Sequence, residues 1–184
     1  MTGAFDDIVG YAGQYTVAHN EIDEKMSELL GVIPTTIVAI PDSPQEYKVD
    51  FFLLHIINAL IFLPTILRQT WMTPEAKARL VEWFGRYCIL TYASANSPDL
   101  STERLESYKL ENLRSWGELI SRSVNLEVDD GHLSKLVRVL MFAEKMAMQK
   151  AGKGETPLVR EGLWLKLANV ANDSIHDDEI ESPQ

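Results

Sequence analysis

The stretch FFLLHIINALIFLPTIL, residues 51–67, decides the fold class that this 184-residue sequence predicts. It is almost continuously apolar and falls just short of the about 18–20 residues that span the hydrocarbon core of a bilayer. His55, Asn58 and Pro64 interrupt it, and polar groups are costly inside a membrane. We therefore expect a fully buried core helix rather than a transmembrane segment, with no membrane partner. Pro64 should kink or end that helix.

Helical patterns continue on both sides of this stretch. Thr73, Pro74 and Glu75 supply an N-cap, a proline in the first turn and an early acid, which open a helix reaching to about Ser94. A long amphipathic helix follows Asp129-Asp130, with Leu133, Leu136, Val137, Leu140, Met141 and Ala147 along one face. Further helices are predicted over residues 22–30, 34–40, 105–125 (as one helix or two) and 161–175. Nothing in the sequence indicates a sheet, so we expect an all-α protein.

The length and composition favour one domain over residues 1–184, built as a single bundle of about seven helices. A chain of this length suits one core, and 46% hydrophobic with 24% charged residues is typical of globular proteins. Residues 176–184 are acidic and poor in apolar side chains, so we expect a frayed tail there.

The charge balance bears on partners and location. With a net charge of −10, the chain is not expected to form a basic face, which argues against a nucleic-acid partner. The first residues carry two Asp and no basic segment, so we do not expect a secretory signal. We expect a cytoplasmic location. Cys88, the single cysteine, lies in an apolar, aromatic helical segment and is interpreted as a buried packing thiol.

Two familiar motifs of enzyme chemistry are not supported. Gly152-Lys153-Gly154 has no strand before it and lacks the other glycines of a nucleotide-binding loop, so it is interpreted as a plain loop. The sequence contains no Gly-x-Ser-x-Gly elbow of the kind that hydrolases use.

Histidines and their helical neighbours are the remaining candidates for a site. Asn58 lies three residues after His55 on the same stripe of the apolar helix, which either lines a polar cavity or satisfies itself by hydrogen bonds. His132 opens the long amphipathic helix, where a neutral imidazole could bind a metal or act as a base. Lys135 and Arg138 turn toward the polar side of that helix, as a solvated face or as ligand contacts.

A second polar stripe lies on the last predicted helix. Lys166, Asn169, Asp173 and His176 repeat at intervals of three and four residues, opposite the apolar side chains of that helix. We interpret this stripe as an ordinary solvent-facing surface. His19 precedes a helix in a polar context and is assigned no role.

Several blocks of the sequence resemble, in order, the C-terminal half of the questin oxidase-like family. They are Asp50 to Asn58, Phe62-Leu63-Pro64, Trp71 with Lys77-Ala78-Arg79-Leu80, Tyr92-Ala93-Ser94, Asp130 to Arg138, and Trp164 to Asn169 with Asp173-Ser174 behind. Together they extend from about residue 14 to residue 175. Each block is a short helical pattern, and it is their order and spacing that carry the resemblance.

The resemblance implies an all-helical enzyme of fungal secondary metabolism. Family members use molecular oxygen to oxidise or open anthraquinone-type rings, often described as Baeyer–Villiger oxidation. It therefore implies an oxidoreductase acting on a small aromatic polyketide.

The resemblance also assigns roles to residues. His55 and His132 match histidine positions of the family, and Lys135 and Lys166 match lysine positions. We expect His55, Asn58, His132 and Lys135 to be catalytic, with the two histidines as metal ligands. Iron(II) is the expected metal, and NADPH is a second expected cofactor, for which Lys166 and Arg138 are the candidate binding residues.

Two departures from the family pattern bear on these roles. Family members are about twice as long, and Ala59-Leu60 stand where relatives tend to carry small hydroxyl residues. Two histidines are also too few for a closed metal site. The chain is therefore expected to be one part of a two-part enzyme, a homodimer that completes its site between subunits, or a shortened relative that has lost the reaction.

A different class of function stays open beside the enzyme. The alternative is a non-catalytic helical protein that binds a ligand or a partner, and the plainest version is a structural bundle whose histidines satisfy local hydrogen bonds. The enzyme hypothesis requires the imidazoles of His55 and His132 to meet inside the bundle, beside a hollow large enough for a flat aromatic molecule.

Overall fold

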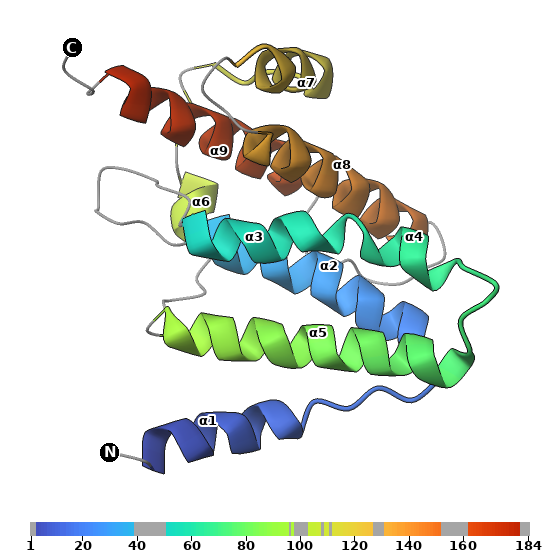
Figure 1. Ribbon diagram of the computed structural model, residues 1–184. Coiled ribbons are helices and arrows are strands. Elements are labelled where there is room, and N and C mark those ends of the chain that lie inside the picture. Colours follow the sequence, from blue (N-terminus) through green and yellow to red (C-terminus); the bar gives the residue numbers. More distant parts are fainter. Residues whose placement is uncertain are drawn as a thin grey trace.

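The computed structural model describes residues 3–38, 51–95, 97, 103–107, 109–110, 112–126, 131–151 and 162–180. Within these ranges all regular structure is helical, and the prediction of an all-α fold is confirmed (Figure 1). The helices there are α1 (Gly3–Gly13), α2 (Ile22–Val38), α3 (Phe51–Leu60), α4 (Leu63–Leu67), α5 (Pro74–Ser94), α6 (Glu103–Ser107), α7 (Trp116–Asn125), α8 (His132–Ala151) and α9 (Leu163–Ile180).

The described residues thus hold nine helices, where about seven were expected. The helix α1 was not predicted, and α4 and α6 are single turns of five residues each. The expected helix end at Gly31 is wrong, because α2 continues through it to Val38. Gly31 is buried beside the core residues Leu29 and Leu30, and packing of this kind outweighs a glycine penalty of about 1 kcal/mol.

The last helix also differs from the prediction. It runs to Ile180, five residues beyond the expected end at Ile175, so part of the expected frayed tail is helical. The sequence offers no glycine or proline to stop it before Pro183. Residues 181–184 lie outside the described residues.

The helix that begins the apolar stretch ends before Pro64, as predicted. The helix α3 stops at Leu60, and Pro64 then stands in the first turn of α4, where its missing N–H is tolerated. In the described part of the chain, no helix is long and apolar enough to cross a membrane. The expectation of a fully buried α3 is wrong in one respect, because His55 is exposed while its neighbours Leu54 and Ile56 are buried.

The helices stack as successive layers (Figure 1). From one end of the molecule to the other they are α1, α5, the pair α2 and α3, the pair α8 and α9, and α7. The central helix α8 touches α2 and α3 on one side and α7 and α9 on the other. Its buried face is therefore wider than one stripe, and includes Val139 and Ala143 besides the predicted leucines, whereas Met141 is exposed.

Local caps explain where two of the helices begin. The hydroxyl of Thr73 accepts a hydrogen bond from the backbone N–H of Ala76 at 3.2 Å, which confirms the predicted start of α5. Ser115 and Glu118 form a reciprocal capping box at the start of α7.

The connection between α1 and α2 is fastened to α5. Arg86 Nε donates to the carbonyl oxygen of Tyr15 at 3.0 Å, and the backbone N–H of Val17 donates to Glu82 Oε2 at 3.1 Å. The ring of Tyr15 lies directly on Gly85, where even a methyl group would overlap its carbon atoms. Glycine at this position is what lets the connection approach α5.

The contact between Tyr15 and Gly85 gives a first prediction. Gly85→Ala forces the half-buried Tyr15 ring aside, and overpacking of this kind costs about 1–3 kcal/mol. Urea denaturation should show a lower free energy of unfolding. Gly117→Ala is the matched control, because nothing lies within 4 Å of a Cβ there and alanine favours a helix. Equal stability of the two variants would contradict the packing argument.

Candidate functional site

The packing of α3 against α8 brings His55 and His132 together. They are 77 positions apart in the chain, yet their Nε2 atoms lie 3.2 Å from each other. The ring centroids are 4.8 Å apart, and the ring planes are inclined by 62°, an edge-to-face arrangement. The expected meeting of the two imidazoles is confirmed.

The surroundings of the pair differ from the expectation. His55 is exposed and His132 is only half-buried, so the rings meet at an edge of the bundle and not inside it. The physical reason is that α3 buries its apolar residues against α2, α5 and α8, and His55 projects from the strip that remains.

The separation of the Nε2 atoms fits two kinds of interaction. Two imidazole nitrogens that bind one metal at about 2.0–2.1 Å, in adjacent tetrahedral or octahedral positions, lie about 2.9–3.4 Å apart. The same separation suits a direct N–H···N hydrogen bond of about 3 Å between two neutral rings. Among the residues that the structure describes, no group of three or more His, Cys, Asp or Glu side chains is placed to hold a metal ion. If a metal binds here, the described residues would supply two of its ligands, His55 and His132.

Asn58 links the two helices beside the histidines. Its side chain is 6% exposed, and its Nδ2 donates to the backbone carbonyl oxygen of His132 at 3.4 Å. The other amide atom, Oδ1, is buried and has no hydrogen-bond partner within the described structure. Asn58 therefore contacts the first residue of α8, and its expected catalytic role stays a prediction.

The predicted basic residues lie in different settings. Lys135 is half-buried, and it follows His132 by one turn of α8, so the two side chains share a face. Arg138 is exposed on the same helix. Lys166, on α9, donates from Nζ to the carbonyl oxygen of Glu106 at 2.7 Å and so holds α6. The roles assigned to these three residues stay predictions.

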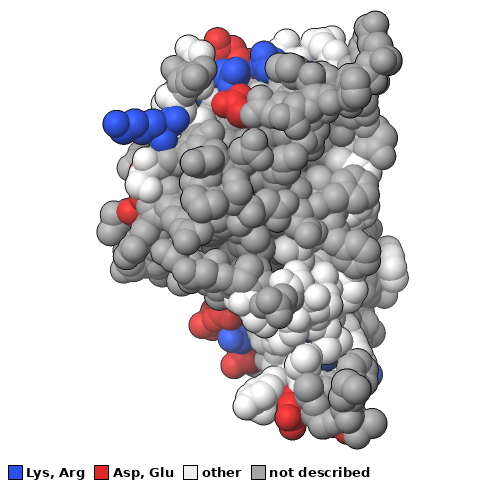
Figure 2. Space-filling model, turned by 90° about the vertical axis from the view of Figure 1, so that its left-hand side faces the viewer, with Lys and Arg blue, Asp and Glu red and all other residues white. Residues whose placement is uncertain are grey.

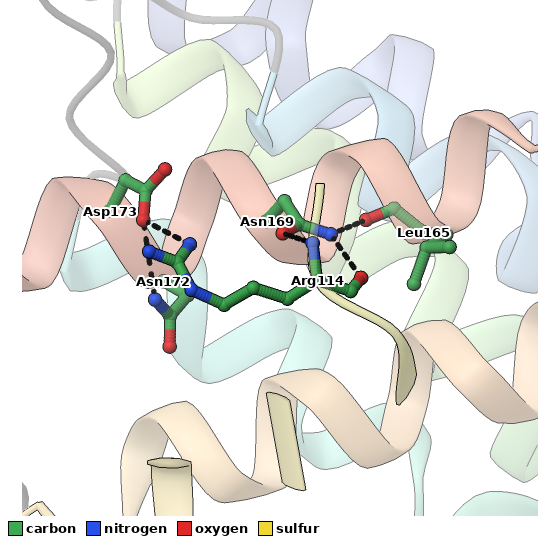
Figure 3. Close-up of polar contacts among 5 residues, drawn as sticks. All are labelled: Arg114, Leu165, Asn169, Asn172 and Asp173. Carbon is green, nitrogen blue, oxygen red and sulfur yellow. Dashed lines mark hydrogen bonds and ion pairs between the residues drawn. The ribbon is translucent and has the colours of Figure 1, made fainter. Parts of the chain in front are cut away.

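The polar stripe on α9 is buried at Asn169 and half-buried at Lys166 and Asp173, so this part is not the solvent-facing surface that we expected; the side chain of His176 lies outside the described residues. Asn169 is fully buried, and its Oδ1 accepts from the backbone N–H of Arg114 at 2.8 Å while its Nδ2 donates to the carbonyl oxygen of Arg114 at 3.0 Å and to that of Leu165 at 2.9 Å (Figure 3). One asparagine side chain therefore pairs with both backbone groups of residue 114, as a neighbouring strand would.

The stripe also makes a charged contact. Arg114 Nη1 forms an ion pair with Asp173 Oδ1 at 2.6 Å, and the fully buried Asn172 donates to the same oxygen at 3.3 Å (Figure 3). The spacing of Asn169 and Asp173 was visible in the sequence. What it could not reveal is that residues 112–115 cross over this face and exclude water from it.

Described residues line a hollow along α7. Its lining residues are Asn112, Arg114, Glu118, Ser121 and Arg122. His55 and His132 are not among these residues, so this hollow is separate from the histidine pair. A substrate cavity beside the histidines stays a prediction.

Charged side chains are mixed on the face drawn in Figure 2. Among the described residues of that face, the few Lys and Arg side chains stand near Asp and Glu side chains at both its upper and lower ends. No continuous basic patch is formed by the described residues on that face.

Cys88 packs against the core from α5. It is a free thiol, and burial raises its pKa to about 12. A thiol with so little thiolate is a poor nucleophile and a poor metal ligand at neutral pH. The interpretation of Cys88 as a packing residue is confirmed.

Comparisons with known proteins identify related sequences. The family model described as "Questin oxidase-like" matches residues 1–140, which include His55, Asn58 and His132 but not Lys166. The match begins and ends earlier than the blocks of resemblance, which extend from about residue 14 to residue 175.

Relatives of established name are similar over most of the chain. The Baeyer-Villiger oxidase ptaJ of Pestalotiopsis fici is 32% identical over 174 residues, which are 93% of this chain and 39% of the relative. The questin oxidase of Aspergillus terreus is 33% identical over 177 residues, 95% of this chain and 40% of the relative. Oxidoreductase AflY of Aspergillus parasiticus is 30% identical over 175 residues, which are 94% of this chain and 35% of the relative. This chain spans about two fifths of the length of these relatives or less.

The link through Asn58 gives a second prediction. Asn58→Ala removes a buried hydrogen bond between α3 and α8 and should lower the free energy of unfolding by about 1–2 kcal/mol. The ¹⁵N chemical shifts of the His55 and His132 rings should change as well, because the start of α8 loses its tie to α3. Asn125→Ala is the control, since Asn125 is exposed and bonds only within α7. Unchanged stability and ring shifts in Asn58→Ala would contradict this role.

The pKa of Cys88 gives a third prediction. Burial raises that pKa from 9.0 to about 12, so between these pH values the unfolded chain releases a proton that the folded chain keeps. Stability should therefore be fully present below about pH 9 and should fall as the pH rises toward 12. Cys88→Ala should reduce the slope of unfolding free energy against pH between 9 and 11. Part of the slope should persist, because burial also raises the pKa of Tyr15 to about 12.

Proposed function

Because this chain belongs to the questin oxidase-like family, we propose that it is an oxygen-using oxidoreductase acting on an aromatic polyketide, or the C-terminal component of such an enzyme. The observation that carries the proposal is the 3.2 Å separation of His55 Nε2 and His132 Nε2. Relatives of this family are named questin oxidase and Baeyer-Villiger oxidase, which supports an oxidation reaction. The cytoplasm is its proposed location.

The proposed metal ligands are His55 and His132, with iron(II) as the metal. Bound iron(II) would supply the binding and reduction of molecular oxygen, which side chains alone do not perform. The residues of this chain contribute position: α3 presents one imidazole, the first turn of α8 presents the other, and Asn58 ties the two helices together. Lys135, one turn after His132, is the nearest predicted cation along α8 and is proposed to contact the substrate.

The pair of histidines requires further ligands. Oxygen-activating iron sites of proteins commonly use at least three protein ligands, and these two imidazoles supply two. Since His55 is exposed, groups from a second copy of the chain or from a partner subunit could reach the same metal. We propose that the working site forms in this way.

The reductant is a separate part of the proposal. NADPH is proposed as the electron source, with Lys166 and Arg138 as the residues to bind its phosphates. Lys166 is held by the carbonyl oxygen of Glu106, so nucleotide binding by Lys166 would require that contact to open. Arg138 is exposed and needs no such change.

A non-catalytic role is the second candidate. The 3.2 Å distance between the imidazole nitrogens also suits a hydrogen bond. In that case the two histidines join α3 to α8, and the chain is a helical protein that binds a ligand or a partner and is derived from the family.

Metal titration distinguishes the two candidates. Anaerobic iron(II) titration of the purified protein, followed by calorimetry, should give saturable binding that His55→Ala and His132→Ala each weaken at least tenfold. His19→Ala is the control, because His19 is exposed in the segment between α1 and α2. Circular dichroism should show that the variants keep their helices. If the parent protein does not bind iron(II), or if all variants bind it equally, the metal site is rejected. The two histidines then have only a structural role.

Oxygen consumption tests the reaction itself. With a hydroxyanthraquinone, iron(II) and NADPH present, the protein should consume oxygen, and either histidine variant should lose that activity. If substrate-dependent oxygen uptake persists in His55→Ala, the site lies elsewhere in the molecule.

A further inference from the structure

The hollow along α7 has the size of a small-molecule site. Its volume is about 490 Å³, and ligand pockets of proteins usually measure about 300–1,000 Å³. The residues that line it are Arg114, Arg122, Glu118, Ser121 and Asn112. Each of these side chains carries a group that can hydrogen-bond to a polar ligand.

Two of the charges on this wall are already engaged. Arg114 is paired with Asp173 at 2.6 Å. The Oε2 atom of Glu118 accepts hydrogen bonds from the backbone N–H and the hydroxyl of Ser115, at 2.8 and 2.7 Å. The hydroxyl contact of Ser115 is the main reason why the pKa of Glu118 is lowered. Glu118 therefore stays ionised, with its charge directed into the cap of α7.

Arg122 is the remaining charged residue of this wall, and it takes part in none of these contacts. Glu118 precedes it by four residues, a spacing at which helical ion pairs form, yet no ion pair or hydrogen bond of Arg122 occurs within the described ranges. Its Nε atom is buried there without a partner. An unpaired buried donor is energetically unfavourable, and structures seldom keep one without a reason.

We propose that the hollow along α7 binds a small anionic molecule through carboxylate or phosphate oxygens. Arg122 is its principal contact, because a guanidinium group binds either anion in a bidentate manner. Arg114 lies on the same wall with its charge paired to Asp173, and Ser121 and Asn112 offer hydrogen bonds. This site is separate from the histidine pair and requires neither iron nor oxygen.

Binding of simple anions tests the proposal. The protein would be titrated with inorganic phosphate and, separately, with phthalate, while backbone ¹H–¹⁵N spectra are recorded. We expect saturable shifts confined to residues 112–122 and their neighbours on α9, for one or both anions, and weaker binding at higher NaCl concentration. The anion that binds more tightly shows whether the site prefers phosphate or carboxylate oxygens. Benzamide, a neutral aromatic, should cause no such shifts.

Matched arginine variants complete the test. Arg122→Gln should weaken the binding at least tenfold, whereas Arg79→Gln, an exposed position on α5, should leave it unchanged. Thermal unfolding should show that Arg122→Gln is no less stable than the parent, since it removes an unpaired charge. Shifts that are absent, that do not saturate, that spread over the whole surface, or that persist in Arg122→Gln would each overturn the proposal.

Discussion

The packing of α3 against α8 is the contact on which both the core and the candidate site depend. Buried residues of the two helices, such as Ile57 and Leu136, belong to the same core cluster. Burial of apolar surface supplies the main stabilising energy of such a contact. It also sets the axial register of the helices, and this register determines the separation of His55 and His132.

The position of the histidine pair at the edge of that contact has chemical consequences. An imidazole buried inside the bundle would need an internal partner for each nitrogen, whereas an exposed ring remains accessible to a metal ion or a ligand from another chain. The family relatives are more than twice as long as this chain, with 39–40% of ptaJ and of the Aspergillus terreus enzyme covered. The exposure of His55 agrees with the proposal that other protein groups complete a site at this pair.

The other end of the molecule is organised by polar contacts. Asn169 and Asp173 of α9 hold the backbone and the side chain of Arg114 (Figure 3), and that segment leads directly into α7. Buried polar groups of this kind are unfavourable unless they are fully paired, so they specify one position for the incoming segment. The hollow beside Arg122 exists because α7 is held at that position.

Local sequence patterns were enough to predict the fold class and several helix ends. Hydrophobic periodicity and caps act within a few residues, so the all-α fold, the cap at Thr73, the break at Pro64 and the buried leucines of α8 could all be inferred from the chain alone. The same local rules placed a helix end at Gly31 and another near Ile175, and both were wrong, because packing sustained one helix and no helix-breaking residue stopped the other.

For the site, the sequence by itself determined the residue types and their helical faces: His55 and Asn58 share one stripe, and Lys166, Asn169 and Asp173 share another. Only the tertiary structure decided that His55 meets His132, that the meeting point is exposed, and that the α9 stripe is covered by residues 112–115. The physical reason is that the spacing of residues in a helix determines which side chains lie on the same face. Whether that face meets water or another segment depends on contacts between residues far apart in the chain, which no local pattern contains.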